Sequence, residues 1–322
     1  MKRLGCIGLF AGLALIAAMF LVVQNWTGGG PLARETSVIV PEGASLTRAA
    51  QEMEKAGALA SADRFRLFAR IFGSGAPVRA GEYAVPAGIS PADLLALMQS
   101  GRVLQRLVTV PEGTPSVLVH DALMAAEHLE GTVAVPAEGS VLPDSYSYQR
   151  GDTRAAVLAR MQAAMDEYLE KAWATRKPGI AVSTPREAVI LASIVEKETA
   201  KPEERRAVAA VYSNRLKRGM PLQADPTVIY PVTKGRPLGR RILRSELRAR
   251  NGYNTYAMAG LPAGPIANPG RASIDAVLDP AQSSALYFVA DGTGGHVFAD
   301  TLEQHNANVA KWYALRRARG EM

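Results

Sequence analysis

One stretch of the chain, residues 184–199, has the sequence of a helix that is buried on every side. Thr184 can cap this helix, and Glu187 completes a Thr-x-x-Glu capping box. The residues that follow, 188–195, are apolar with a single exception. Because a helix that is apolar all round must be covered by other parts of the protein, the sequence predicts a core helix around which a folded domain is built.

The predicted helix ends in two carboxylates, Glu196 and Glu198. A carboxylate at the edge of an apolar environment holds its proton more tightly than one in water, and this property suits a general acid. The two residues lie about 200° apart around the helix axis, so they cannot both face one substrate. Apolar residues accompany both of them, so periodicity does not choose between them, and both could equally be surface charges near a helix end.

The amino-terminal segment predicts a membrane anchor. Residues 4–23 carry no charge, follow Lys2 and Arg3, and precede Trp26. A helix of this length spans about 30 Å, the thickness of a hydrocarbon core. The positive-inside rule then gives residues 1–27 a cytoplasmic tip and a single transmembrane helix in the inner (plasma) membrane, with the rest of the chain periplasmic or otherwise extracytoplasmic. A cleaved signal peptide is the alternative, but the apolar run exceeds its usual core of about 7–15 residues.

The net charge of +7 allows nucleic acid, anionic lipid or an anionic polymer as a partner. Nucleic acid is the weakest of these choices, because only 6% of the residues are aromatic and no basic stripe is interleaved with them. Cys6 is the one cysteine, which excludes intrachain disulfides and thiolate metal sites. The four histidines show no ligand spacing, so we expect neither a metal nor a cofactor.

A short pattern recurs after the amino-terminal segment, at residues 38–43, 83–88 and 108–113. Each copy is a β-branched or aromatic run, then Pro-x-Gly, then a capped helical segment, which is a sensible α+β unit. Residues 36–105 therefore predict a small α+β module. This module has no cluster of catalytic residue types, and either a spacer or a carbohydrate-binding role fits it.

Residues 108–319 predict a larger mixed α+β domain. Its centre is a helical hairpin made of the core helix and a second helix that opens at Pro202. The part that follows is predicted to be rich in β-structure, with a strand within residues 223–230 and a hairpin around Asp291-Gly-Thr-Gly-Gly295. Tyrosines and amides in this part are typical of sugar-binding surfaces, because ring faces stack on C–H bonds while amides meet hydroxyls.

Several motifs in this domain resemble, in order, those of the YceG-like family of endolytic murein transglycosylases. They cover residues from about 140 to 312 and lie at 191–199, 211–216, 222–230, 253–256, 260–270, 286–292 and 295–298. The module over 36–105 is similar to the LysM-like domain of that family, and residues 108–319 correspond to its catalytic domain.

The resemblance implies a lyase that cleaves the MurNAc–GlcNAc bond inside nascent peptidoglycan strands, leaves 1,6-anhydro-MurNAc ends and so terminates strand elongation. It implies Glu196 as the catalytic glutamate. One glutamate can protonate the leaving oxygen and then remove the proton of the attacking C6 hydroxyl, so intramolecular attack replaces a second carboxylate.

The resemblance also implies contacts with glycan strands, and penicillin-binding proteins as neighbours in the membrane. Two alternatives remain open from the residues alone: a non-catalytic, membrane-anchored glycan-binding scaffold, and a two-carboxylate muramidase-type hydrolase with Asp225 as the second acid. The substrate-binding residues implied by motif matching are Asn214, Gln223, Asp225, Thr227, Tyr230, Tyr253, Asn254, Tyr256 and Asn268.

Overall fold

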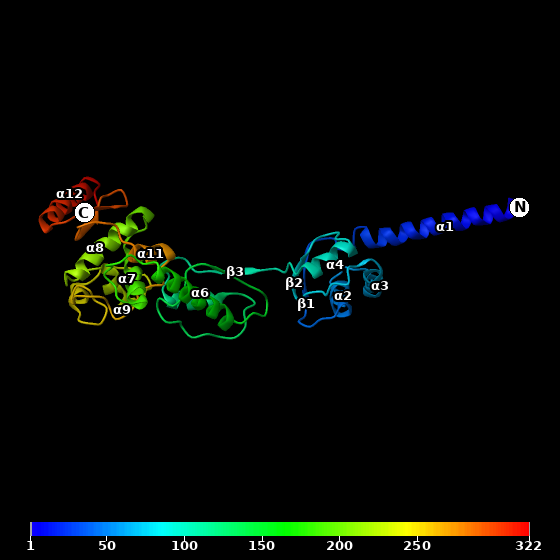
Figure 1. Cartoon of the computed structure of the whole chain (residues 1–322), viewed down its shortest axis with the longest axis horizontal. Coiled ribbons are helices and arrows are strands. Elements are labelled where there is room, and N and C mark those ends of the chain that lie inside the picture. The colour runs from blue at the N-terminus through cyan, green and yellow to red at the C-terminus, as the bar shows by residue number, and fades with distance from the viewer. Residues whose placement is uncertain (1, 322) are drawn as a thin grey trace. The chain divides into compact units, whose positions relative to one another are not determined.

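The computed structural model describes the backbone of residues 2–321 and the side chains of residues 12–321. The chain folds as two compact units (Figure 1). Unit 1 contains the residues up to 106 together with 149–151, and unit 2 contains residues 107–148 and those from 152 onward. The fold is mixed α+β, as predicted, with helices predominating and three two-stranded sheets in the described part of the chain.

Unit 1 is built on an antiparallel pair of strands, β1 (Thr36–Val40) and β2 (Gly81–Val85), with Thr36 opposite Val85. Three helices contribute to its core, and each begins at a serine whose hydroxyl accepts a backbone N–H three residues along, the usual N-cap arrangement. They are α2 (Leu46–Lys55), α3 (Ala62–Phe72) and α4 (Pro91–Ser100). The helical segments expected after residues 38–43 and 83–88 are therefore present, as α2 and α4.

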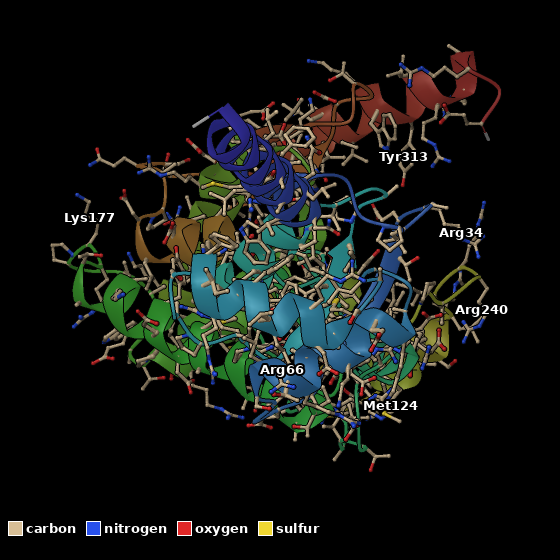
Figure 2. The ribbon with its side chains drawn as sticks, turned by 90° about the vertical axis from the view of Figure 1, so that its right-hand side faces the viewer. Arg34, Arg66, Met124, Lys177, Arg240 and Tyr313 are labelled. Carbon is tan, nitrogen blue, oxygen red and sulfur yellow. The ribbon has the colours of Figure 1, made fainter. Side chains whose placement is uncertain are left out.

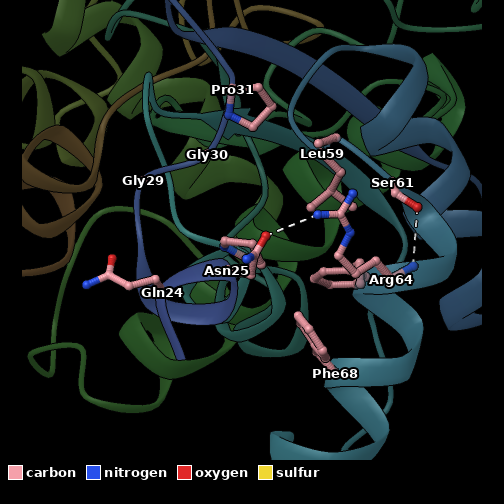
Figure 3. Close-up of a pocket in the computed structure, with 12 residues that line it drawn as sticks. Gln24, Asn25, Gly29, Gly30, Pro31, Leu59, Ser61, Arg64 and Phe68 are labelled. Carbon is pink, nitrogen blue, oxygen red and sulfur yellow. Dashed lines mark hydrogen bonds between the residues drawn. The ribbon is translucent and has the colours of Figure 1, made fainter. Parts of the chain in front are cut away.

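The end of the first helix, α1 (Lys2–Thr27), packs into the core of unit 1. Trp26 is 8% exposed, and its ring centroid lies 6.0 Å from that of Phe65 on α3. Beside this contact the guanidinium of Arg64 donates to the side-chain oxygen of Asn25 at 3.1 Å (Figure 3). Trp26 is thus a core residue of the module, whereas the sequence indicated a residue that flanks the predicted membrane anchor.

The expected transmembrane anchor is a prediction that the structure contradicts. No helix within the described residues is long and apolar enough to cross a membrane. The prediction of a single-pass helix over residues 4–23 is therefore wrong on this finding.

Unit 2 is organised around the predicted core helix, α7 (Pro185–Glu198). All residues of 188–195 are buried. The hydroxyl of Thr184 accepts the backbone N–H of Glu187 at 3.1 Å, and the carboxylate of Glu187 reaches back to the N–H of Ser183 at 2.6 Å. The helix thus starts where the capping pattern predicts, although the glutamate satisfies the amide one residue before the cap.

The helical hairpin is also present. A short 3-10 turn, η1 (Pro202–Glu204), leads from α7 into α8 (Arg205–Lys217), and the two helices pack together. Helix α11 (Arg271–Leu278) contacts both of them and closes the core, and the long helix α6 (Arg154–Ala174) packs against α7 and α11.

The carboxyl-terminal part of unit 2 is mainly helical. The prediction that this part is rich in β-structure is therefore wrong. Where the sequence suggested a strand over 223–230, the chain forms helix α9 (Asp225–Thr233). Its first turn holds an acid and a proline, which suit a helix start, and this outweighs the β-branched residues that follow. Helices α10 (Arg244–Arg248) and α12 (Leu302–Ala318) belong to the same part. Its described strands are the predicted hairpin, β5 (Tyr287–Ala290) and β6 (His296–Ala299).

A second, smaller cluster of buried residues in unit 2 lies under strands β3 (Arg106–Thr109) and β4 (Ser145–Tyr148) and helix α5 (Ser116–Ala125). Arg154, at the start of α6, ties this region together by donating to five backbone carbonyls. These belong to Leu123, Met124, Ala126, Leu129 and Gly131.

Basic side chains are spread over the exposed surface of both units. In Figure 2, Lys177 and Arg240 of unit 2 reach outward into solvent. The positive net charge of the chain is therefore available to an anionic partner.

Candidate active site

The structure gives Glu196 and Glu198 different surroundings at the end of α7. Glu198 lines a pocket of about 300 Å³, and Glu196 is not among the residues that line it. The difference follows from the helix itself, because residues two apart point about 200° apart. The other residues of the pocket come from α8, α9, β5, α12 and two loops, and they are Tyr212, Arg215, Leu222, Gln223, Asp225, Tyr256, Phe288 and His305.

Burial in this pocket raises the pKa of the Glu198 carboxyl from 4.5 to about 7. A hydrogen bond from Tyr212 opposes the rise, the negative charge of Asp225 adds to it, and the positive charge of Arg215 opposes it. Near neutral pH this side chain is therefore present both as an acid and as its conjugate base. That is the property a group needs if it is to give a proton and take one back in the same reaction.

Gln223, Asp225 and Tyr256 form one wall of the pocket. The hydroxyl of Tyr256 donates to Asp225 Oδ1 at 2.6 Å. Gln223 has a left-handed backbone with φ of 56°, which is uncommon for a residue with a side chain and is found preferentially at functional sites. Its backbone N–H donates to the carbonyl of Thr255 at 3.1 Å. Two segments that the sequence analysis singled out are thus held side by side.

Arg215 is a buried cation, 8% exposed, that supports the pocket from α8. Its Nε donates to the carbonyl of Leu286 at 2.7 Å, and one terminal nitrogen donates to the carbonyl of Leu222 at 2.8 Å and to Gln223 Oε1 at 3.3 Å. The guanidinium also lies 5.2 Å from the ring centroid of Tyr287. One side chain therefore positions β5 and the loop before α9, and places a positive charge near Glu198.

Two aromatic rings, those of Tyr212 and Phe288, also line the pocket. Phe288 packs edge-on against Tyr212, with 5.8 Å between ring centroids. Rings of this kind offer an apolar face to the C–H bonds of a sugar. Together with the carboxylates, the amide and the hydroxyls, they make the pocket chemically suited to a carbohydrate.

Glu196 is engaged elsewhere, in a cluster that fixes the loop before α11. Its Oε1 accepts from Arg205 at 3.3 Å and its Oε2 accepts the backbone N–H of Gly270 at 3.0 Å. Arg205 also reaches Glu112 at 3.2 Å. The Glu196 side chain is 6% exposed, and both of its oxygens already have donors. Its geometry is that of a clamp between α7 and the Gly260–Gly270 loop.

Two of the predicted sugar-binding amides are fully buried and serve the protein's own backbone. The amide nitrogen of Asn254 donates to the carbonyls that end α10, those of Glu246, Leu247 and Ala249. The side chain of Asn268 donates to the carbonyl of Thr114 and accepts the N–H of Val141. Neither residue lines the pocket.

The other predicted binding residues outside the pocket also have partners within the protein. Asn214 donates to the carbonyls of Ser283 and Ala285. Thr227 is buried and hydrogen-bonds with Thr255 at 2.8 Å. Tyr230 donates to Glu138 at 3.1 Å and lies against Tyr253, with 4.9 Å between ring centroids. Of the predicted binding residues, the structure therefore brings Gln223, Asp225 and Tyr256 to the pocket.

Besides the aliphatic Leu222, four residues of the pocket were not predicted from the sequence: Tyr212, Arg215, Phe288 and His305. Tyr212, Arg215 and Phe288 lie inside the recognised motifs at 211–216 and 286–292, but the sequence pattern indicated core or surface positions for them. His305 lies outside those motifs and carries no local signal. No group of three or more His, Cys, Asp or Glu in the described part of the chain could hold a metal ion.

Comparison with known proteins identifies relatives of this chain. It is 36% identical over 182 residues to the endolytic murein transglycosylase of Bacillus subtilis strain 168, an alignment that covers 56% of the chain and 49% of the relative. It is 29% identical over 324 residues to the protein of the same name from Streptococcus pneumoniae serotype 2, covering 85% of the chain and 58% of the relative. The chain thus spans about half the length of the curated relatives it matches.

A solved structure of a yceG-like protein from Listeria monocytogenes is also similar, with a TM-score of 0.52 and 25% identity, covering 85% of this chain and 99% of that one. The YceG-like family itself matches residues 38–311. Because this match takes in most of both units, the chain belongs to the YceG-like family.

Proposed function

We propose that the chain is an endolytic lytic transglycosylase that cleaves the MurNAc–GlcNAc bond of peptidoglycan glycan strands, with Glu198 as its acid and base. The observation that carries this proposal is the position of Glu198. Its carboxyl, with a pKa of about 7, lines a pocket whose other groups suit a sugar. The names of the relatives support the same reaction and substrate.

The reaction needs one carboxyl group and no water. Protonated Glu198 gives its proton to the glycosidic oxygen, and the bond from that oxygen to C1 of the muramic acid breaks. The C6 hydroxyl of the same sugar then attacks C1, and the Glu198 carboxylate takes the hydroxyl proton. The product is a 1,6-anhydro end, and Glu198 returns to its starting state. Because the nucleophile belongs to the substrate, its effective concentration is high and the protein needs no second nucleophile.

Tyr212 and Arg215 have a role between the two proton transfers. Once Glu198 has given up its proton, its carboxylate is partly buried, and a buried charge is costly unless it is paired. The hydrogen bond from Tyr212 and the charge of Arg215 both favour the ionised form. They therefore stabilise the Glu198 carboxylate until it removes the C6 hydroxyl proton.

Product analysis tests the proposal. The purified chain is incubated with uncrosslinked glycan strands, and the fragments are identified by mass spectrometry. Internal cleavage with 1,6-anhydro-MurNAc ends is the expected result. Binding of the strands by folded protein without any cleavage would refute the lyase and favour the glycan-binding scaffold.

A two-carboxylate hydrolase is the second candidate, because Asp225 lines the same pocket as Glu198. In such an enzyme one carboxyl would act as the acid and the other would activate water or attack the sugar. Asp225 accepts a hydrogen bond from Tyr256, and it would have to retain a free oxygen for that role. Cleavage in ¹⁸O-labelled water separates the two reactions: a hydrolase puts the label into a reducing end, whereas the lyase incorporates none.

The proposed substrate fixes where the enzyme would act. Glycan strands are assembled outside the cytoplasm, so we place the active pocket in the periplasm or another extracytoplasmic space. Terminating nascent strands would put the chain beside penicillin-binding proteins, which are proposed as neighbours. The LysM-like character of the module over 36–105 is likewise a proposal, as is any contact between that module and glycan.

A further inference from the structure

The pocket contains one histidine, and it comes from the last helix of the chain. His305 lies on α12 and lines the pocket together with Glu198 and Asp225. Its imidazole is stacked on the ring of Tyr287, with 5.2 Å between centroids and 23° between planes. Helix α12 packs against both strands of the β5–β6 hairpin. The position of the ring is therefore fixed by stacking and by the helix that carries it.

The hydrogen bonding of this imidazole is incomplete. Its Nδ1 is buried and has no hydrogen-bond partner among the residues that the structure describes. A neutral imidazole carries one N–H, and a buried donor without an acceptor costs free energy. The tautomer with its proton on Nε2 avoids that cost at Nδ1. It leaves Nε2–H as the donor that His305 can offer to a ligand in the pocket.

Burial, together with the positive charge of Arg215, favours the neutral form of the ring. Burial, and then the positive charge of Arg215, lower the pKa of His305 below its usual 6.5. At neutral pH the side chain is therefore uncharged and does not compete with Glu198 for its proton. A neutral donor of this kind suits a sugar hydroxyl or an acetamido oxygen, which carries no charge.

We propose that His305 is a substrate-contacting residue whose Nε2–H donates a hydrogen bond to an oxygen of the amino sugar bound beside Glu198. This inference rests on the proposed function, because it takes the ligand of the pocket to be a glycan. It also assigns a role to α12, which completes the sugar site with a side chain far from the other pocket residues in the sequence.

His305→Phe isolates the proposed hydrogen bond. Phenylalanine keeps the ring that stacks on Tyr287 and removes both nitrogens. Removing an unpaired buried nitrogen should leave the melting temperature unchanged or higher. Binding of uncrosslinked glycan strands, measured by calorimetry in the inactive Glu198→Gln background, should weaken about fivefold to tenfold, the value of one hydrogen bond to a neutral partner. His305→Gln, which keeps an N–H donor, should recover part of this loss.

His120→Phe is the matched control, since His120 lies on α5 and does not line the pocket. It should bind glycan like the parent. Undiminished binding by the His305→Phe protein would overturn the inference while leaving the proposed function intact. Absence of glycan binding by the parent protein would refute the proposed substrate, and the inference with it. Weaker binding that simply follows a lower melting temperature, without recovery in His305→Gln, would show that His305 only supports the fold.

Discussion

Replacing Glu198 by glutamine should stabilise the protein, and should do so increasingly as the pH rises. The folded state raises the pKa of this carboxyl from 4.5 to about 7, so it binds the proton more tightly than the unfolded chain does. The contribution of Glu198 to stability is therefore most favourable below pH 4.5. It is lost as the pH rises through about 7, because the buried group must then ionise. Glutamine has the same shape and does not ionise.

The magnitude follows from the two pKa values. Each tenfold change in an ionisation constant is worth about 1.4 kcal/mol. Between pH 5 and pH 8, most of the difference between 4.5 and about 7 is expressed. We therefore expect the stability gained by Glu198→Gln to grow by about 2 kcal/mol over this interval. For a chain whose total stability is about 5–15 kcal/mol, this is a large effect.

Urea unfolding of the full chain at pH 5 and pH 8, followed by tyrosine and tryptophan fluorescence, measures the effect. The control is Glu303→Gln, which removes an exposed carboxylate on α12 and should leave the pH dependence of stability as in the wild type. Two results would refute the argument that burial holds the proton on Glu198. One is an increase in the free energy of unfolding by Glu198→Gln that is equal at the two pH values, and the other is a decrease that grows with pH.

Further predictions concern the surroundings of the site and the framework of unit 2. Glu196→Gln should destabilise the protein by about 1–3 kcal/mol in urea unfolding, because its two donors lose a charged acceptor, yet cleavage should persist; complete loss of cleavage by the folded variant would count against its role as a clamp. Asp225→Asn should move the upper limb of the pH–rate profile to lower pH, because it removes a negative charge that raises the pKa of Glu198; an upward movement would be inconsistent with that coupling. Arg154→Ala should lower stability by about 2–4 kcal/mol, since five carbonyls lose a charged donor, and a change within error would mean that water replaces these bonds. Thr184→Ala should cost about 0.5–2 kcal/mol through loss of the cap of α7, and thermal unfolding would disprove this if the midpoint did not move.

The local elements of the fold could be predicted from the sequence because their signals are local. The cap, the apolar run and the closing carboxylates of α7 all lie within residues 184–199. Helix α9 was missed for the same reason, since β-branched residues dominate the stretch after its acid and proline. For the end of α1, the sequence could not tell that Trp26 would pack on the phenylalanines of α3.

The site could be predicted only in part, because its geometry depends on segments that are distant in the sequence. Glu196 and Glu198 each lie on an apolar face of α7, so the sequence of the helix does not distinguish them. The choice between them depends on which residues of the fold pack against each face. The motif around Tyr253–Tyr256 was singled out from the sequence, and of its residues Tyr256 lines the pocket. Asn254 has the composition of a sugar ligand and serves instead as the cap of a short helix. A polar residue in a motif can support a site without touching its substrate.

The assignment of the acid is tested most directly by comparing Glu198→Gln with Glu196→Gln on the same glycan strands. Both variants remove one carboxylate from the end of α7, and circular dichroism checks that both are folded. The proposed mechanism predicts that the Glu198→Gln protein forms no anhydro-ended fragments, while the Glu196→Gln protein forms them at a rate within about tenfold of the wild type, the equivalent of roughly 1.4 kcal/mol. Anhydro products from Glu198→Gln, together with none from folded Glu196→Gln, would contradict the mechanism and return the catalytic role to Glu196.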